Sequence, residues 1–159
     1  MRMRPDIERQ IAAKLEQLLG TLPGNVANLE RGVDPSHPDV KVPYFTFSPM
    51  NQSASPISIE VSNEQGAVVT IGHGSYREFW PDGGNLAGSL PLDEEILLIC
   101  MTVMSSSFSE RVCYDSSERI IQARLALLVK GQQVGFGYGN VLWGFLRRKS
   151  YRTFQYKPY

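Results

Sequence analysis

The feature that most constrains this chain is a strict alternation of apolar and polar residues over positions 57–62. Ile57, Ile59 and Val61 alternate there with two serines and a glutamate. Successive side chains of a β-strand point to opposite faces, so this spacing predicts a strand with one face buried and one in water. Residues 63–66 (NEQG) have the length and the final glycine of a hairpin connection, and residues 67–71 return as the partner strand. The sequence therefore predicts an antiparallel pair over residues 57–71.

Other segments also have strand character, namely residues 40–47, 119–129, 134–143 and 151–156. Pro43 cannot donate to a ladder, which predicts that its segment lies at a sheet edge. Gly135, Gly137 and Gly139 alternate with larger residues, so they share one face where a helix or an aromatic ring can approach closely. The run GFGYGN lacks the G-x-G-x-x-G spacing of a dinucleotide site, and no cofactor is expected.

Two helices are predicted. Residues 5–19 begin with a proline and two acidic residues, carry an apolar stripe at spacings of three and four, and are followed by Gly20 as a stop signal. Residues 91–112 begin with Asp93, Glu94 and Glu95 and are apolar on most sides, which indicates a central, buried helix. Residues 20–39 are expected to form a long polar loop.

These elements predict an α+β fold: a largely antiparallel sheet of about five to six strands, with an N-terminal helix and a buried central helix packed on it. With 159 residues the chain is expected to form one domain, residues 1–159. A hydrophobic content of 42% and a charged content of 20% are typical of globular proteins. Cys100 and Cys113, both placed on the second helix, would point in different directions and form no disulfide.

Charge and hydropathy limit the location and the partners. The formal net charge is zero, so no global field attracts nucleic acid or a membrane surface. The N-terminus lacks the apolar region of a signal peptide, and the longest apolar run, residues 96–104, is too short to span a bilayer. A cytoplasmic protein is expected.

Residues 68–80, VVTIGHGSYREFW, hold the densest group of reactive and aromatic side chains. His73 with Glu78 suggests an acid/base pair, because imidazole titrates near neutral pH. No serine or cysteine nucleophile motif accompanies it, and the two histidines and two cysteines lack the spacing of a zinc site. We therefore expect no catalytic residue and no metal ligand; the alternative is a small enzyme or ligand-binding domain with a pocket near His73 and Glu78.

Tyr76, Arg77, Glu78 and Trp80 have the composition of a protein-binding hot spot, while Phe79 is expected to point inward. Residues 141–159 carry five basic residues and no acidic one, and Arg147, Arg148 and Arg152 are the candidate contacts there. This basic end is either a solvated strand face or a site for an anionic partner. RNA binding through Arg147, Arg148, Lys149, Arg152 and the late tyrosines is a further hypothesis.

The order of strand, glycine turn, aromatic and acidic element, and helix in VVTIGHGSYREFW…LDEEILLICMTVM resembles small bacterial immunity proteins of polymorphic toxin and contact-dependent inhibition systems. Those proteins often carry H-x-H-F or H-x-E-F after a glycine. The matching positions are Tyr76, Glu78 and Phe79, with Tyr76 where the first histidine would stand. The resemblance implies a non-catalytic cytoplasmic protein that binds and blocks one cognate toxin.

Overall fold

A computed structural model describes residues 6–35, 42–139 and 150–159. These residues form two helices and a nine-stranded antiparallel sheet, so the α+β class is confirmed and the predicted five to six strands are too few. The helices are α1 (Ile7–Thr21) and α2 (Leu92–Ser105). The strands are β1 (Ala27–Val33), β2 (Pro43–Pro49), β3 (Ile57–Ser62), β4 (Gly66–Ile71), β5 (Ser75–Phe79), β6 (Phe108–Tyr114), β7 (Ile120–Val129), β8 (Gln132–Tyr138) and β9 (Ser150–Tyr156). They lie in the order β1-β2-β3-β4-β5-β8-β7-β6-β9.

The helix α1 has the predicted stripe, with Ile7, Ile11, Leu15 and Leu18 all buried. Its start is fixed by Asp6, whose side chain accepts a hydrogen bond from the backbone N–H of Arg9 at 3.1 Å. The helix runs through Gly20 to Thr21, beyond the predicted end. Helix α1 therefore packs on the body from one side, as its pattern indicates.

The helix α2 ends at Ser105, seven residues before the predicted end. The Ser105 hydroxyl donates to the carbonyl of Met101 at 2.7 Å, and Ser106 has extended dihedrals. Serine side chains that bond the backbone compete with helical hydrogen bonds, so this serine run terminates the helix. The prediction of a helix to residue 112 is wrong, and Cys113 lies on β6 rather than on the helix.

Three strands, β1, β5 and β6, were not predicted from the sequence. The strand β6 has an alternating face of Phe108, Glu110 and Val112, and β1 lies within the segment expected to be loop. The strand β1 is a sheet edge and is largely exposed, so little apolar alternation marks it. Because β1 pairs with β2, β2 is an interior strand and Pro43 does not mark a sheet edge. A proline is tolerated there because it is the first residue of its strand.

The hairpin of β3 and β4 is confirmed, with Ile59 opposite Val69. After β4, residues 72–74 make a second tight turn, with φ of +67° at Gly72 and +129° at Gly74. The chain then returns as β5, with Tyr76 opposite Thr70. Residues 66–79 thus form a β-meander with β3.

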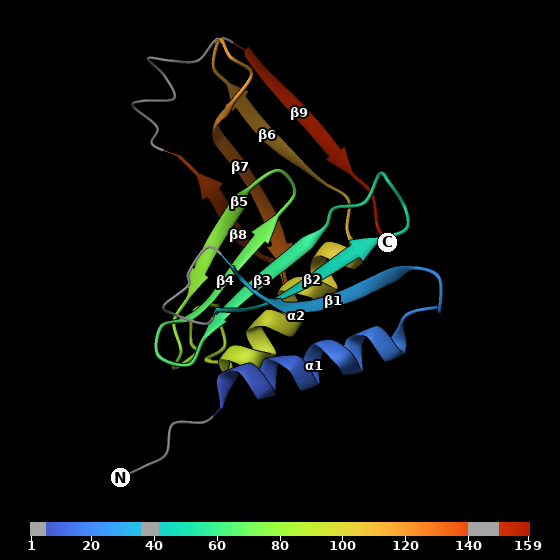
Figure 1. The fold of residues 1–159 in the computed structure, drawn as a ribbon, viewed down its shortest axis with the longest axis vertical. Coiled ribbons are helices and arrows are strands. Elements are labelled where there is room, and N and C mark those ends of the chain that lie inside the picture. Colours follow the sequence, from blue (N-terminus) through green and yellow to red (C-terminus); the bar gives the residue numbers. More distant parts are fainter. Residues whose placement is uncertain (1–5, 36–41, 140–149) are drawn as a thin grey trace.

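Both helices lie on one face of the sheet, and the opposite face is here called the outer face (Figure 1). Phe45, Phe47, Ile59, Ile96 and Ile99 are in the main core between the helices and the sheet. We call this helix-covered part the body. Strands β6 and β9, with residues 120–123 of β7, extend beyond the helices in Figure 1, and we call them the arm. The arm has a separate small core of Val112, Tyr114 and Ala123.

Candidate partner-binding groove and the Glu110 cluster

The strand β5 divides the predicted contact residues between the two faces of the sheet. Tyr76 and Glu78 lie on the outer face, opposite Thr70 and Val68 of β4. Phe79 is 1% exposed, as expected, whereas Tyr76 is 40% and Trp80 is 67% exposed. Arg77 alternates to the helix side, so it does not join Tyr76 and Glu78 on one surface.

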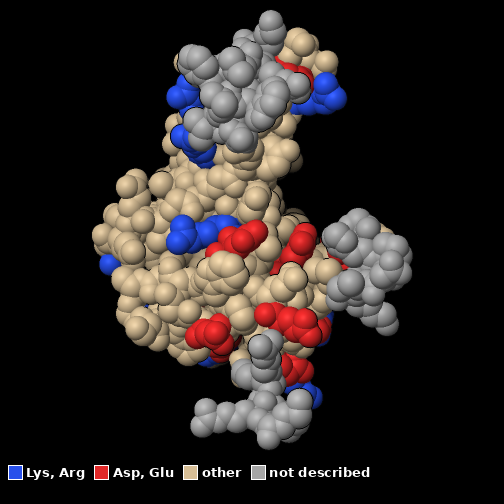
Figure 2. Space-filling view, turned by 90° about the vertical axis from the view of Figure 1, so that its left-hand side faces the viewer, with Lys and Arg blue, Asp and Glu red and all other residues tan. Residues whose placement is uncertain are grey.

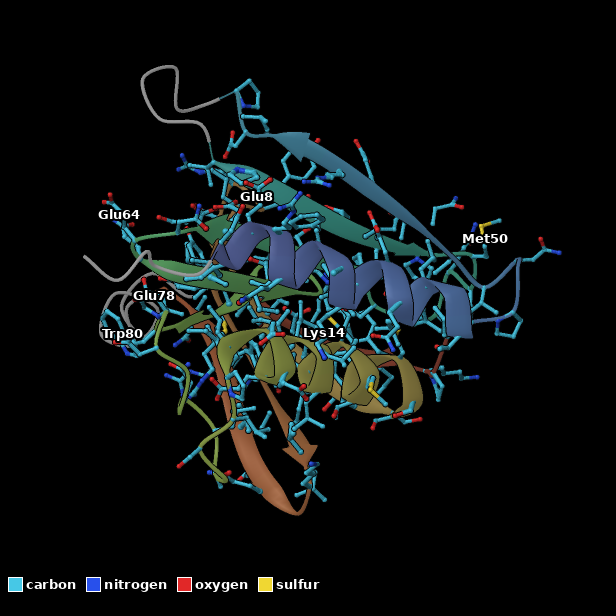
Figure 3. All side chains as sticks on the ribbon, turned by 90° about the horizontal axis from the view of Figure 1, so that it is seen from below. Glu8, Lys14, Met50, Glu64, Glu78 and Trp80 are labelled. Atoms are coloured by element: carbon cyan, nitrogen blue, oxygen red, sulfur yellow. The ribbon has the colours of Figure 1, made fainter. Side chains whose placement is uncertain are left out.

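A groove of about 980 Å³ lies beside the end of β5. Its lining comes from the β3–β4 hairpin, from Glu78, from residues 80–82 and from Val42. Figure 3 shows Glu64, Glu78 and Trp80 gathered at one end of the sheet, with Met50 at the opposite end. The groove therefore brings together two of the predicted contact residues, Glu78 and Trp80.

The groove is acidic. Glu60, Glu64, Glu78 and Asp82 line it, and none of these carboxylates forms an ion pair with another residue in the part of the chain that the structure describes. Acidic side chains gather on the body in Figure 2, whereas the arm shows mainly basic ones. On this face the charges are thus divided unevenly between the body and the arm.

The backbone of the exposed Trp80 is fixed by hydrogen bonds to the side chain of Asn85. Its N–H donates to Asn85 Oδ1 at 2.7 Å, and Asn85 Nδ2 donates back to its carbonyl at 3.2 Å. Asn85 Nδ2 also donates to Glu95 at 2.8 Å, and the same carboxylate accepts from the N–H of Leu86. Glu95 is fully buried in the first turn of α2. The loop that begins at Trp80 is therefore bonded to helix α2.

Arg77 and Arg152 lie away from the groove lining. Arg77 donates to the carbonyl of Gly135 at 3.2 Å and stands over the ring of Phe79 at 6.0 Å. Its buried Nε makes no hydrogen bond to a described residue. Arg152 lies on β9 in the arm, over the ring of Tyr114 at 5.0 Å and 3.8 Å from Glu118. Arg147 and Arg148 lie outside the described residues.

His73 belongs to a different site, centred on the fully buried carboxylate of Glu110. The backbone N–H of His73 donates to Glu110 Oε2 at 2.9 Å, the Ser75 hydroxyl donates to Oε1 at 2.7 Å, and the Tyr156 hydroxyl donates to Oε2 at 2.7 Å. We call these four residues the Glu110 cluster. A buried carboxylate is costly unless several donors satisfy it, and this one has them.

The His73 ring is oriented by the same cluster. Its Nδ1 lies 2.8 Å from the Tyr156 hydroxyl and 3.2 Å from Glu110 Oε2, and its ring stacks on Phe154 with centroids 3.8 Å apart. Burial, followed by the hydrogen bond to Glu110, raises the pKa of Tyr156, so its hydroxyl stays protonated and can donate. The side chain of His73 is 39% exposed, and Nε2 has no hydrogen bond to a described residue.

The predicted pair of His73 and Glu78 is not formed. His73 precedes β5 and Glu78 lies near its other end, about 16 Å apart along an extended chain. His73 does not line the groove, whereas Glu78 does. Glu110 was missed because residues 108–112 were assigned to the helix, and without it Ser75 and Tyr156 had no visible partner. With β6 recognised as a strand, a glutamate between Phe108 and Val112 on one face would have indicated a buried, satisfied charge.

The described residues contain no group of three or more His, Cys, Asp or Glu side chains arranged to hold a metal ion. Neither helix among them has the length and apolar character needed to cross a membrane. Comparison with family models, curated proteins and solved structures yields no match to this chain.

Proposed function

We propose that this protein is a non-catalytic binding protein, an immunity protein that binds and neutralises a cognate toxin. The observation that carries the proposal is the exposed Trp80 at the groove, 67% accessible and anchored through Asn85 to α2. Large aromatic side chains on a fixed backbone are characteristic contact residues, because little conformational entropy is lost when they are buried. The resemblance of residues 57–104 to immunity proteins supports the same class.

The groove also supports a proposal about the chemistry of the partner. Four carboxylates without described ion-pair partners favour a protein segment rich in lysine or arginine. A cationic side chain entering the groove can also lie over the Trp80 indole, where cation–π attraction adds to the ion pairs. The partner expected on this basis presents basic residues around the region that the immunity protein blocks.

The test is binding to the purified product of the neighbouring gene, measured by calorimetry. Trp80→Ala and Glu78→Lys are each expected to weaken binding by about tenfold or more, as hot-spot residues do. Met101→Ala is the matched control, because Met101 is an exposed apolar residue on α2, 48% accessible and outside the groove lining. Wild-type protein that forms no complex, or Trp80→Ala protein that binds as tightly as wild type, contradicts the proposal.

A second candidate, a small enzyme, is favoured by the geometry of His73. A histidine whose Nδ1 is held by a buried carboxylate and a tyrosine, with Nε2 unpaired among described residues, has the arrangement of a general base. His73→Gln is expected to abolish any hydrolysis of a panel of ester and phosphoester substrates and to leave thermal stability nearly unchanged. Wild-type protein without activity above buffer on the whole panel argues against this candidate.

A further inference from the structure

The outer face of the sheet carries its charges in two separate halves. On one side, Glu78 lies opposite Val68, which lies opposite Glu60. On the other side, Gly137 lies opposite Arg124, which lies opposite Arg111. Tyr76 lies opposite Gly137, between the acidic half and the basic half.

Within each half, the charges have the same sign and lack a described counter-charge. Arg111 and Arg124 face each other directly across β6 and β7, an arrangement that is destabilising on a sheet. Their contacts are with neutral groups. Arg111 stands over the Tyr151 ring at 4.2 Å, and Arg124 donates at 2.9 Å to the Gln122 amide in its favoured orientation. Neither arginine forms an ion pair with a residue that the structure describes.

The surface between the halves is flat and partly apolar. Gly135 is exposed and has open space where a Cβ would stand, so nothing rises above the backbone there. Ala126, which faces Gly135, is exposed, and Leu128 on the same face of β7 is 69% exposed. With Tyr76, these residues form an apolar strip flanked by opposite charges.

We infer that the outer face binds a second copy of this chain, in a symmetric dimer. A two-fold axis lying between the two faces and parallel to the strands, at the junction of β5 and β8, places each acidic half over the basic half of the other copy. Such a symmetric contact forms every ion pair twice, which is the property of a self-complementary surface. It also places Tyr76 of each copy over the glycine-lined strip of the other.

The available area suits a reversible dimer. The six neighbouring strands from β3 to β6, spaced ~4.8 Å apart and ~20 Å long, offer roughly 500 Å² per copy, at the low end for specific interfaces. Glu60 and Glu78 also line the groove, so a second copy and the proposed toxin would exclude each other. The dimer itself does not depend on the proposed function, because it is measured with this protein alone.

The test is sedimentation equilibrium of the full chain over a range of concentrations. Wild type is expected to shift from 17.8 kDa towards twice that mass, with weaker association in high salt. The paired reversals E60R/E78R and R111E/R124E are each expected to weaken association by about tenfold or more, because each places like charges across the interface. The chain with all four substitutions exchanges the two halves and is expected to dimerise again.

The control is E16R/E118R, which changes the net charge as E60R/E78R does but on α1 and on the turn between β6 and β7. It is expected to associate as wild type.

Wild type that stays at 17.8 kDa into the millimolar range overturns the inference. A dimer that survives either pair of reversals overturns it too, and so does a four-substitution chain that associates no better than either pair. Rescue by the four substitutions separates loss of the interface from loss of the fold. Trp80→Ala, which is expected to impair toxin binding but not dimerisation, separates this inference from the proposed function.

Discussion

The body and the arm are stabilised in different ways, although they share one sheet. The body buries a large continuous core under both helices, including Phe45, Phe47 and Ile99. The arm buries only Val112, Tyr114 and Ala123 in a core of its own. It is joined to the β4–β5 turn by the four residues of the Glu110 cluster. Apolar area therefore dominates the stability of the body, whereas the arm relies on its β-ladders, a small core and the satisfied Glu110 carboxylate.

The two cysteines report on these two regions separately. Cys100 lies in α2 of the body and Cys113 in β6 of the arm, and both are free and buried. Burial raises the pKa of the Cys100 thiol to about 12, so it reacts only after the body opens. Labelling rates of the two thiols therefore measure the opening of each region.

The largest effect is expected for Phe47→Ala. Phe47 is fully buried in the main core, and its truncation should lower the free energy of unfolding by about 4 kcal/mol through lost burial and a residual cavity. Denaturant unfolding measures the loss. Because the arm needs the body as its support, both cysteines should label faster. Acceleration of Cys100 alone would show that the arm is stable without the body.

Glu110→Ala is expected to come next and to act on the arm. The change leaves the His73 N–H and the Ser75 and Tyr156 hydroxyls without their acceptor. The stability of the arm should therefore fall by about 3 kcal/mol. Cys113 should label faster by a larger factor than Cys100. Glu95→Ala is the control, since it removes another fully buried carboxylate but frees only the loop that carries Trp80. Equal acceleration of both thiols in Glu110→Ala would remove the distinction between the two regions.

A smaller effect is expected for Val112→Ala, which removes two buried carbon atoms from the small core. The free energy of opening of the arm should fall by about 2 kcal/mol. Cys113 should therefore label faster, while the labelling rate of Cys100 changes little. Thr153→Ala on the exposed side of β9 is the control. If the two variants behave alike, the small core contributes nothing to the stability of the arm.

The smallest effect is expected at the turn between β6 and β7. The backbone N–H of Arg119 is the main cause that lowers the pKa of Asp115. A lowered pKa in the folded state contributes stability above the unfolded pKa, and this contribution is lost as the pH falls through the folded pKa. Asp115→Asn should therefore reduce stability slightly near pH 7 and make no difference in strong acid. Amide exchange of residues 115–119 at the two pH values measures the effect.

The sequence predicts the parts of the fold whose signal is local. The β3–β4 hairpin and the stripe of α1 follow from periodicity within a few residues. The strand β6 was missed because the apolar pattern of α2 continues past residue 105, and only the serines mark the change of period. The strand β1 was missed because an exposed edge strand needs no apolar face.

The groove residues could likewise be predicted from local sequence, whereas the Glu110 cluster could not. The exposure of Tyr76 and Trp80 could be expected from the composition of the stretch around them and from their neighbours along the chain. The partner of His73 does not, because Glu110 lies 37 positions away on another strand, and the turn at residues 72–74 directs His73 to it and away from Glu78. Contacts set by strand order across a nine-stranded sheet are not encoded in local spacing.

The Glu110 cluster also bears on how the chain acquires its structure during synthesis. Its members are separated by up to 83 positions, and the Tyr156 hydroxyl is one of its donors. The β3–β5 meander can form early from contacts close in sequence, but the arm cannot be fixed until residue 156 has left the ribosome. Until then the Glu110 carboxylate stays hydrated and the edge of β6 stays unpaired. A nascent chain of this protein should therefore expose an incomplete sheet to chaperones until residue 156 has emerged.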